Sequence, residues 1–460
     1  MWTRRALFQL VAAGTVAAPP AIAAAPDRPA TGSGVSRRDE LAALRAFAES
    51  THPRGAIAAS DPDWQKRWRE LAFESDRLSD GPYFHRLRRA LGWFRDGHTT
   101  VLPFEFVGGV PPALADGPFR WALPLRLRMF DEGALVVAAG GDAVSLLGCR
   151  LVSIGGRSVA DLLRTFAVDW PGNEAWAQRW SAGALVTPAF LQALGAIADP
   201  WHPIAVEARA PDGQPVQALL QPLDGKLPPL QEVQRTPTPR EAWARAAGGG
   251  NYTRDLGGGV TFASIDDMDD VEGKTFEALT REVFAQLDRA DTRRIIIDLR
   301  RNGGGNNFFG EALRKGIGRS RCNRPGGLYV LIGPQTFSAA QNLANRLERE
   351  TYAIFVGEPT GGAPNHYGDA RTLAGPVTGL TVMVSTLPWF DSYPQDVRPW
   401  ILPDLPVPDS SEDWRAGRDR ALETALAHRD DAAPEDWSRD RVFYFRRPSQ
   451  QRGWTPSWRT

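Results

Sequence analysis

Cysteine and lysine are both scarce in this chain of 460 residues. The two cysteines, Cys149 and Cys322, show no metal-ligand or Cys-x-x-Cys spacing and cannot form a disulfide framework, so we expect both to be buried and structural. The lysines are Lys66, Lys226, Lys274 and Lys315. No lysine follows Lys315, so composition alone excludes a catalytic lysine in the C-terminal part of the chain.

The sequence also lacks an excess of charge of one sign and a long apolar run. It contains 54 basic and 54 acidic residues, with a pI near 7.0. Balanced charge argues against nucleic acid or an anionic membrane surface as the main partner. No later run reaches the roughly 18 apolar residues needed to span a bilayer. We therefore expect a soluble protein without stable membrane insertion.

The N-terminus has the features of an export signal. Arg4 and Arg5 form a twin-arginine pattern, a mildly apolar run extends from Leu7 to Ala18, and Ala21-Ile22-Ala23 offers a cleavage site. These features predict a twin-arginine signal peptide over residues 1–25 and a periplasmic or secreted protein in a bacterium. A linker rich in Pro, Gly and Ser follows at 26–36.

Apolar periodicity divides the rest of the chain into parts. Apolar residues at helical spacing around Leu44 and Leu87 indicate a helical domain, and Gly97 suits a helix C-cap turn that places His98 on the following loop. Alternating strands and helices nearer the C-terminus are typical of a largely parallel α/β layer, whose last strand is expected at 380–385. The expected parts are a helical domain at 37–102, a β-rich domain at 118–225 with strands at 123–128, 134–138, 150–154, 204–208 and 216–220, a linker at 226–250, an α/β core at 251–428 and a tail at 429–460 with no predicted function.

A junction between a strand and a helix provides the first candidate nucleophile. Leu328 to Ile332 form a short apolar run, Gly333 and Pro334 break it, and apolar residues recur at helical spacing from Ala339 onward. Ser338 therefore lies at the start of the helix, where unpaired amides and the helix dipole would stabilise an oxyanion. Because serine is also a preferred N-cap, a purely structural role is an equal alternative.

A glycine-rich loop provides the second chemical signal. Asp298-Leu299-Arg300-Arg301-Asn302-Gly303-Gly304-Gly305 follows a strand of three isoleucines that is expected to be buried on both faces. Glycines at the C-terminal end of a strand let backbone amides approach a ligand closely. The loop lacks the spacing of a P-loop or a dinucleotide site, so no nucleotide cofactor is expected, and no pattern indicates a metal.

Taken together, the motifs of residues 251–428 resemble the C-terminal-processing (tail-specific) serine peptidases. The similar segments are Asp-Leu-Arg-x-Asn-Gly-Gly-Gly, Gly-Pro-x-Thr-x-Ser-Ala-Ala, Gly-Glu-Pro-Thr-Gly-Gly and Leu-Pro-Asp-Leu-Pro-Val. The resemblance implies a crotonase-like α/β spiral core, an N-terminal helical domain and a PDZ-like insert, although an unrelated β-rich insert fits the 118–225 region nearly as well. It implies that Ser338 is the nucleophile, with the amides of Ala339 and of Gly303 or Gly304 as the oxyanion hole.

The sequence departs from the Ser-Lys branch of that family. Ala363 stands about where that branch has its lysine. The tricorn-like branch takes a histidine from the helical domain instead, and His98 matches that position, with Asp396 as the candidate carboxylate that orients it. Gly97 stands where tricorn has a serine. His366, with Asp369 nearby, is the alternative base; the other histidines are read as ordinary polar residues.

The predicted function is that of an exported serine peptidase that cleaves peptides or unfolded protein tails through an acyl-enzyme on Ser338. Two alternatives remain open at this point. The same scaffold serves as a ligand carrier in the interphotoreceptor retinoid-binding repeats, and the nucleophile with its oxyanion hole does not distinguish a peptidase from an esterase.

Overall fold

The computed structural model describes residues 35–225, 227–271 and 273–428. The predicted signal peptide, most of the 26–36 linker and the 429–460 tail lie outside the described residues. Both cysteines are buried and unpaired, as expected.

The N-terminal part is helical, as predicted. Ser36 and Asp39 form a capping box at the start of the first helix, and the Asp61 side chain caps the third. Apolar side chains on one stripe of each helix, among them Leu44 and Leu87, are buried in a common core. The helices are α1 (Arg37–Thr51), α2 (Gly55–Ser60), α3 (Pro62–Glu74) and α4 (Asp80–Leu91).

A mixed region follows, and it contains more helix than the sequence pattern predicts. Its antiparallel sheet of seven strands has the order β10-β4-β5-β7-β8, with β3 on β4 and β6 on β5. All five predicted strands are present. The strands are β3 (Leu125–Phe130), β4 (Gly133–Ala139), β5 (Arg150–Ile154), β6 (Arg157–Ser158), β7 (Ile204–Arg209), β8 (Pro215–Leu220) and β10 (Gln231–Glu232), with β2 (Trp121–Ala122) paired to β9 (Leu223–Asp224). The helices that the strand pattern concealed are α5 (Val159–Val168), α6 (Glu174–Val186) and α7 (Pro188–Ala193).

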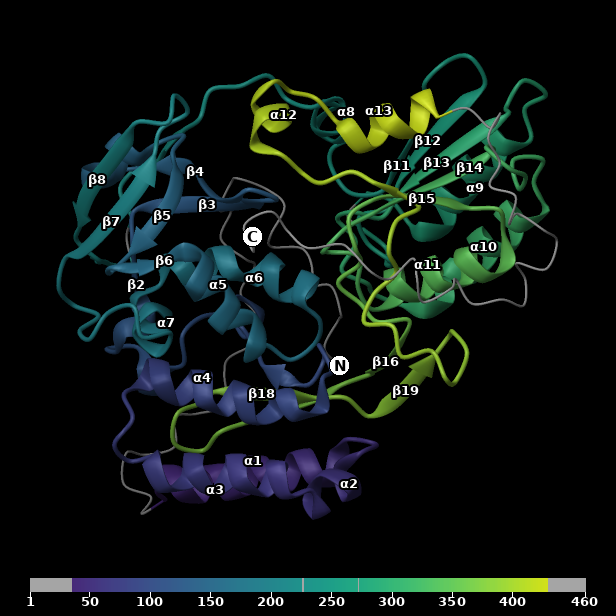
Figure 1. Ribbon diagram of the computed structural model, residues 1–460. Helices are drawn as coiled ribbons and strands as arrows, with labels where there is room; N and C mark the ends of the chain where they lie inside the picture. The colour runs from purple at the N-terminus through teal and green to yellow at the C-terminus, as the bar shows by residue number, and fades with distance from the viewer. Residues whose placement is uncertain (1–34, 226, 272, 429–460) are drawn as a thin grey trace.

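The core sheet has the order β11-β12-β13-β14-β15-β20, parallel from β12 to β20. Its strands alternate side chains between two buried faces: Ile295 and Ile297 pack with residues of α9, α10 and α11, whereas Ile296 packs with residues of α8 and α13. Figure 1 shows these helices next to the sheet. The strands are β11 (Tyr252–Asp255), β12 (Val260–Ser264), β13 (Arg294–Asp298), β14 (Leu328–Ile332), β15 (Ile354–Gly357) and β20 (Leu405–Pro406). The helices are α8 (Pro239–Ala246), α9 (Phe276–Leu287), α10 (Gly310–Arg319), α11 (Ala339–Glu350), α12 (Ser411–Arg415) and α13 (Arg420–Ala427).

The strand expected at 380–385 exists but lies outside the core sheet. It is β18 (Thr381–Val384), which pairs with β17 (Arg371–Ala374) and with β1 (Thr100–Val101), next to α4 (Figure 1). Its apolar side chains join the helical core, and the fully buried Glu40 of α1 accepts hydrogen bonds from the amides of Val377 and Thr378. A local pattern cannot reveal this partner because β1 is about 280 residues away in sequence. The β17–β18 hairpin thus joins the helical part to the core; β16 (Asn365–Gly368) pairs with β19 (Leu387–Phe390) beside it.

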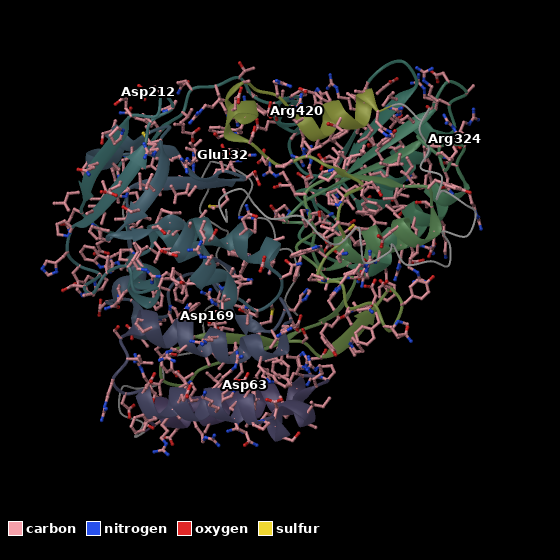
Figure 2. The ribbon with its side chains drawn as sticks, viewed as in Figure 1. Asp63, Glu132, Asp169, Asp212, Arg324 and Arg420 are labelled. Atoms are coloured by element: carbon pink, nitrogen blue, oxygen red, sulfur yellow. The ribbon has the colours of Figure 1, made fainter. Side chains whose placement is uncertain are left out.

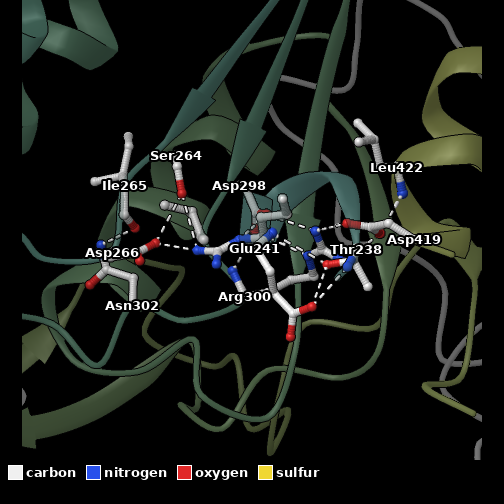
Figure 3. Close-up of polar contacts among 12 residues, drawn as sticks. Thr238, Glu241, Ser264, Ile265, Asp266, Asp298, Arg300, Asn302, Asp419 and Leu422 are labelled. Carbon is white, nitrogen blue, oxygen red and sulfur yellow. Dashed lines mark hydrogen bonds and ion pairs between the residues drawn. The ribbon is translucent and has the colours of Figure 1, made fainter. Parts of the chain in front are cut away.

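Buried charges hold the glycine-rich loop to the core sheet. Asp298 is fully buried at the end of β13 and pairs with Arg240 and Arg300, and Arg300 also pairs with Asp419 (Figure 3). Burial alone would raise the pKa of the Asp298 carboxyl, but the two guanidinium groups hold it well below its usual range. By contrast, charged side chains such as Asp63 and Arg324 are exposed at the edge of the molecule (Figure 2).

Candidate active site

Ser338 lies on a strained turn between β14 and α11. Its backbone has φ 54° and ψ −125°, a conformation that few residues other than glycine adopt. A serine in such a strand-to-helix turn presents its hydroxyl at the sheet's edge, as in a nucleophile elbow. Its side chain makes no capping hydrogen bond. The N-cap alternative therefore loses its physical basis, and the strain is the kind that functional sites hold.

The glycine-rich loop and the Ser338 turn are joined by hydrogen bonds. The amide of Phe337 donates to the Asn302 carbonyl (3.1 Å), and the Thr336 hydroxyl donates to the Leu299 carbonyl (2.9 Å). The Asn302 side chain donates to the Ile265 carbonyl at the end of β12 (2.8 Å). The asparagine of the motif thus fixes both loops at the carboxyl edge of the parallel sheet, where α/β folds bind their ligands.

The two loops that meet at Ser338 carry the three backbone amides that the sequence suggests for an oxyanion hole. The Gly304 amide donates to Oδ1 of Asn302 (2.9 Å) and is thereby occupied. Among the described residues, neither the Gly303 nor the Ala339 amide donates a hydrogen bond to the protein. Of the three amides that the sequence suggests for an oxyanion hole, these two are the better placed to receive a negative oxygen.

Gly304 is where the backbone of the glycine-rich loop comes close to the Ser338 side chain, and a substitution can test this contact. It has φ +117°, and a Cβ there would lie 2.5 Å from Cβ of Ser338. We expect Gly304→Ala to displace the serine and to reduce hydrolytic kcat by at least about 10²-fold, since small misplacements of reacting groups are that costly. Gly257→Ala is the matched control, because Gly257 has φ +78° with nothing within 4 Å of the added Cβ. Equal activity of the two variants in steady-state assays would contradict this role of Gly304.

Ser338 opens into a cavity of about 290 Å³ between the helical part and the core. The cavity is lined by residues of the helical part, of the mixed region, of the glycine-rich loop and of the β17–β18 hairpin. These lining residues are Gly97, His98, Thr100, Leu102, Pro103, Phe106, Trp170, Trp176, Trp180, Gly305, Asn306, Asn307, Phe308, Phe337, Ser338, Asp369, Ala370, Met383 and Trp389. The nucleophile candidate and one histidine therefore face the same space.

That histidine is His98, on the loop between α4 and β1. The pairing of β1 with β18 ties this loop to the hairpin, and the His98 ring stacks on Phe337, with the ring centroids 4.4 Å apart. Gly97 does not form the predicted C-cap turn, since the left-handed residue is Arg95. The position requires glycine, because a Cβ there would lie 2.8 Å from the Phe337 ring. No hydrogen bond joins His98 and Ser338 among the described residues, and such contacts are often loose without substrate.

Asp96 is the carboxylate beside His98. Its Oδ1 lies 3.7 Å from Nδ1 of His98 and accepts from the His98 amide, and its Oδ2 accepts from the hydroxyls of Thr99 and Ser385. Burial alone would raise the pKa of the Asp96 carboxyl, but the neighbouring imidazoles and the Ser385 hydroxyl hold it well below its usual range. The residue is a buried, charged hydrogen-bond acceptor two positions before the histidine.

Sequence reasoning missed a second imidazole at this carboxylate. Nε2 of His52 lies 3.6 Å from Oδ2 of Asp96, and Nδ1 of His52 accepts from the Arg54 amide (3.0 Å). That bond leaves the proton of the neutral ring on Nε2, facing Asp96. The only signal in the sequence was that His52 directly follows a helix with one apolar stripe. Its contact with Asp96 joins two different segments of the chain, so a local sequence pattern could not predict it.

Asp396 lies elsewhere. The structure pairs it with Arg398 (2.7 Å) and with the Ser392 hydroxyl (2.5 Å), and Arg398 also pairs with Glu348. These partners tie the loop after β19 to α11. The carboxylate next to His98 is therefore Asp96, and not the residue chosen from the sequence.

His366, on β16, lies close to His98, and the two rings stack with centroids 5.6 Å apart. Its Nδ1 faces the Ala363 carbonyl at 3.0 Å. Burial, and then the nearby His98, lower the pKa of His366 to about 4. His366 is therefore neutral at pH 7 and a weak base. The three remaining histidines have partners outside the cavity: His85 with Asp169, His202 with Asp199 and His428 with Tyr329.

The described part of the chain contains no group of three or more side chains able to hold a metal ion. In the same residues no helix is long and apolar enough to cross a membrane.

Comparison with known proteins finds similarity in structure only. No protein-family model matches the sequence, and no curated protein matches it. The structure of mature CPAF complexed with lactacystin is 14% identical, with a TM-score of 0.56 over 85% of this chain and 96% of that chain. A second structure of mature CPAF is 14% identical, with a TM-score of 0.53 over 85% and 95%. These matches show that the chain shares its fold with CPAF over nearly its whole described length.

Proposed function

We propose that this protein is a serine peptidase that cleaves peptides or unfolded protein tails through an acyl-enzyme on Ser338. The observation that carries the proposal is the strained turn that presents the Ser338 hydroxyl in the cavity that His98 also lines. The amides of Gly303 and Ala339, in the two loops that meet there, donate to no group among the described residues. The shared fold with CPAF and the motif resemblance to C-terminal-processing peptidases support it. A crotonase-like core and a PDZ-like insert belong to the same proposal.

In the proposed reaction, Oγ of Ser338 attacks the peptide carbonyl carbon. His98 takes the hydroxyl proton and later gives it to the leaving amine, and water then releases the acyl group by the reverse steps. The amides of Gly303 and Ala339 stabilise the oxyanion. Asp96, in place of Asp396, orients His98 through Nδ1, which leaves Nε2 for the serine.

Two other functions are the alternatives on the same scaffold. A carrier has no use for a strained serine with unoccupied amides and a buried Asp96–His98 pair. An esterase would use the same groups. Fluorophosphonate labelling of Ser338 tests the catalytic proposal against the carrier. Matched peptide and ester substrates of the same acyl group test peptidase against esterase.

We also propose that the protein is exported by the twin-arginine route. The twin-arginine receptor reads the guanidinium pair and not charge alone, so replacement of Arg4 and Arg5 with lysine is expected to leave precursor in the cytoplasm. Cell fractionation measures this. An undiminished periplasmic fraction would indicate the general secretory route, and the catalytic proposal would be unaffected.

A further inference from the structure

Four aromatic side chains form a continuous stack of rings through the candidate active site. Trp176 of α6 lies nearly parallel to Phe337, with the ring centroids 4.1 Å apart and the ring planes at 3°. Phe337 faces His98 at 4.4 Å and 28°, and His98 faces His366 at 5.6 Å and 15°. The stack thus joins the mixed region, the residue before the candidate nucleophile, the candidate base and β16.

The stack is fixed in place by its surroundings. The Asn173 side chain accepts from the Trp176 amide (2.8 Å) and donates to two backbone carbonyls of the core (3.0 and 2.6 Å), which holds the start of α6 against the core. A Cβ at Gly361 would lie 3.0 Å from the Trp176 ring, so the indole fills the space that this glycine leaves. Trp176 and Phe337 are both buried. The Phe337 ring is thereby held between the indole and His98, with one face on the imidazole.

The charge of His98 changes during the proposed reaction. His98 becomes an imidazolium when it takes the Ser338 proton, and it is neutral again once that proton is on the leaving amine. A cation over an aromatic face, within about 6 Å of the ring centroid, is attracted by the negative charge of that face, and Phe337 presents such a face. On the other side of the imidazole, His366, whose pKa burial lowers to about 4, is uncharged at pH 7 and adds no repulsion. Asp96 faces the Nδ1 edge of the ring at 3.7 Å.

We propose that Phe337 is a positioning residue whose ring face stabilises the His98 imidazolium in the transition state. The inference rests on the proposed peptidase function and deepens it, because it assigns part of the strength of the base to the residue next to the nucleophile. The attraction is complete only after the proton has moved, so it lowers the barrier of the reaction and not the free energy of substrate binding. A desolvated contact between a cation and an aromatic face corresponds to about 10- to 30-fold in rate.

The experiment replaces Phe337 with phenylalanines that carry one, three or five fluorine atoms. Fluorine withdraws electrons from the ring face and changes the shape of the ring little, so the attraction for a cation weakens stepwise and is reversed in the pentafluoro ring. We expect log kcat on one peptide to fall with the number of fluorine atoms, and kcat of the pentafluoro variant to be about 10- to 30-fold below the wild type. KM should show no such trend, because the imidazolium forms after the substrate has bound.

Two controls separate this electrostatic effect from a change in packing. Phe276 is a buried ring that stacks on Phe309, with the centroids 5.6 Å apart, and on no histidine in the described part of the chain. The same fluorinated series at Phe276 should leave kcat unchanged. The thermal unfolding temperature of the Phe337 variants should not fall, because an electron-poor ring still stacks on the Trp176 indole. A loss of kcat that follows the unfolding temperature, and not the number of fluorine atoms, would overturn the inference.

The rate at which a fluorophosphonate labels Ser338 is measured in the same variants, because labelling needs the same base and no peptide. Cleavage and labelling that are both independent of the number of fluorine atoms would overturn the role of Phe337 and leave the peptidase proposal standing. Labelling that slows with each added fluorine, in a protein that cleaves no peptide, would overturn the peptidase function and leave the role of Phe337. A folded wild type that neither cleaves nor labels would overturn both.

Discussion

Ser338→Ala is expected to abolish peptide hydrolysis, with kcat lower by about 10⁴- to 10⁶-fold, because the proposed mechanism forms its acyl-enzyme on the Ser338 hydroxyl. A fluorophosphonate probe should label the wild type at Ser338 and should not label the variant. The thermal unfolding temperature should be nearly unchanged, since the Ser338 side chain caps nothing in α11. Mass spectrometry of the labelled peptide and calorimetric unfolding measure the two effects.

Ser158 provides the matched control for this experiment. Its side chain accepts from the Asp161 amide (3.1 Å) and caps α5. Ser158→Ala should therefore lose about 1 kcal/mol of stability and keep its activity and its labelling. Full labelling of Ser338→Ala would refute the nucleophile assignment. A wild-type protein that is folded and never labels would favour the carrier function.

His98→Ala is expected to show the second largest effect, a loss in kcat on the order of 10²- to 10⁴-fold with little change in KM, because a general base acts in the transition state. In the proposed mechanism the base, His98, comes from the helical part, while the nucleophile, Ser338, belongs to the core. Catalysis therefore depends on the β1–β18 pairing that brings the two together. Steady-state kinetics on one peptide, with unfolding curves for both proteins, measure this.

His366→Ala is the comparison that decides between the two imidazoles. It should lose much less activity than His98→Ala, because a ring whose pKa lies near 4 is a poor base at neutral pH. Since a protonated imidazole cannot accept a proton, kcat/KM should fall on the acid side of its pH profile. A fall centred near pH 4, with an inactive His366→Ala and an active His98→Ala, would move the base to His366.

The local sequence determined the parts of the site that depend on neighbours in the chain. An apolar run, a Gly-Pro break and a helical stripe place Ser338 at a strand-to-helix turn. Glycines after the isoleucine strand place amides at the same sheet edge, because parallel strands end together. The absence of lysine after Lys315 excludes, by composition alone, a catalytic lysine in the C-terminal part of the chain. The positions of the serine and of the glycine loop can each be predicted because the residues that determine them lie in the same or the adjacent helix or strand.

The tertiary structure alone decided which groups surround the serine. The sequence suggested Asp396 as the carboxylate beside His98, yet Asp396 pairs with Arg398 and the carboxylate that faces His98 is Asp96. Nothing in the sequence assigned His52 to the site, yet its ring lies next to the Asp96 carboxylate. The strand at 381–384 carries the expected pattern but pairs with β1, and this brings His98 toward the core. Side-chain pairings between distant elements depend on how those elements pack, and periodicity within a segment records only which of its faces is buried.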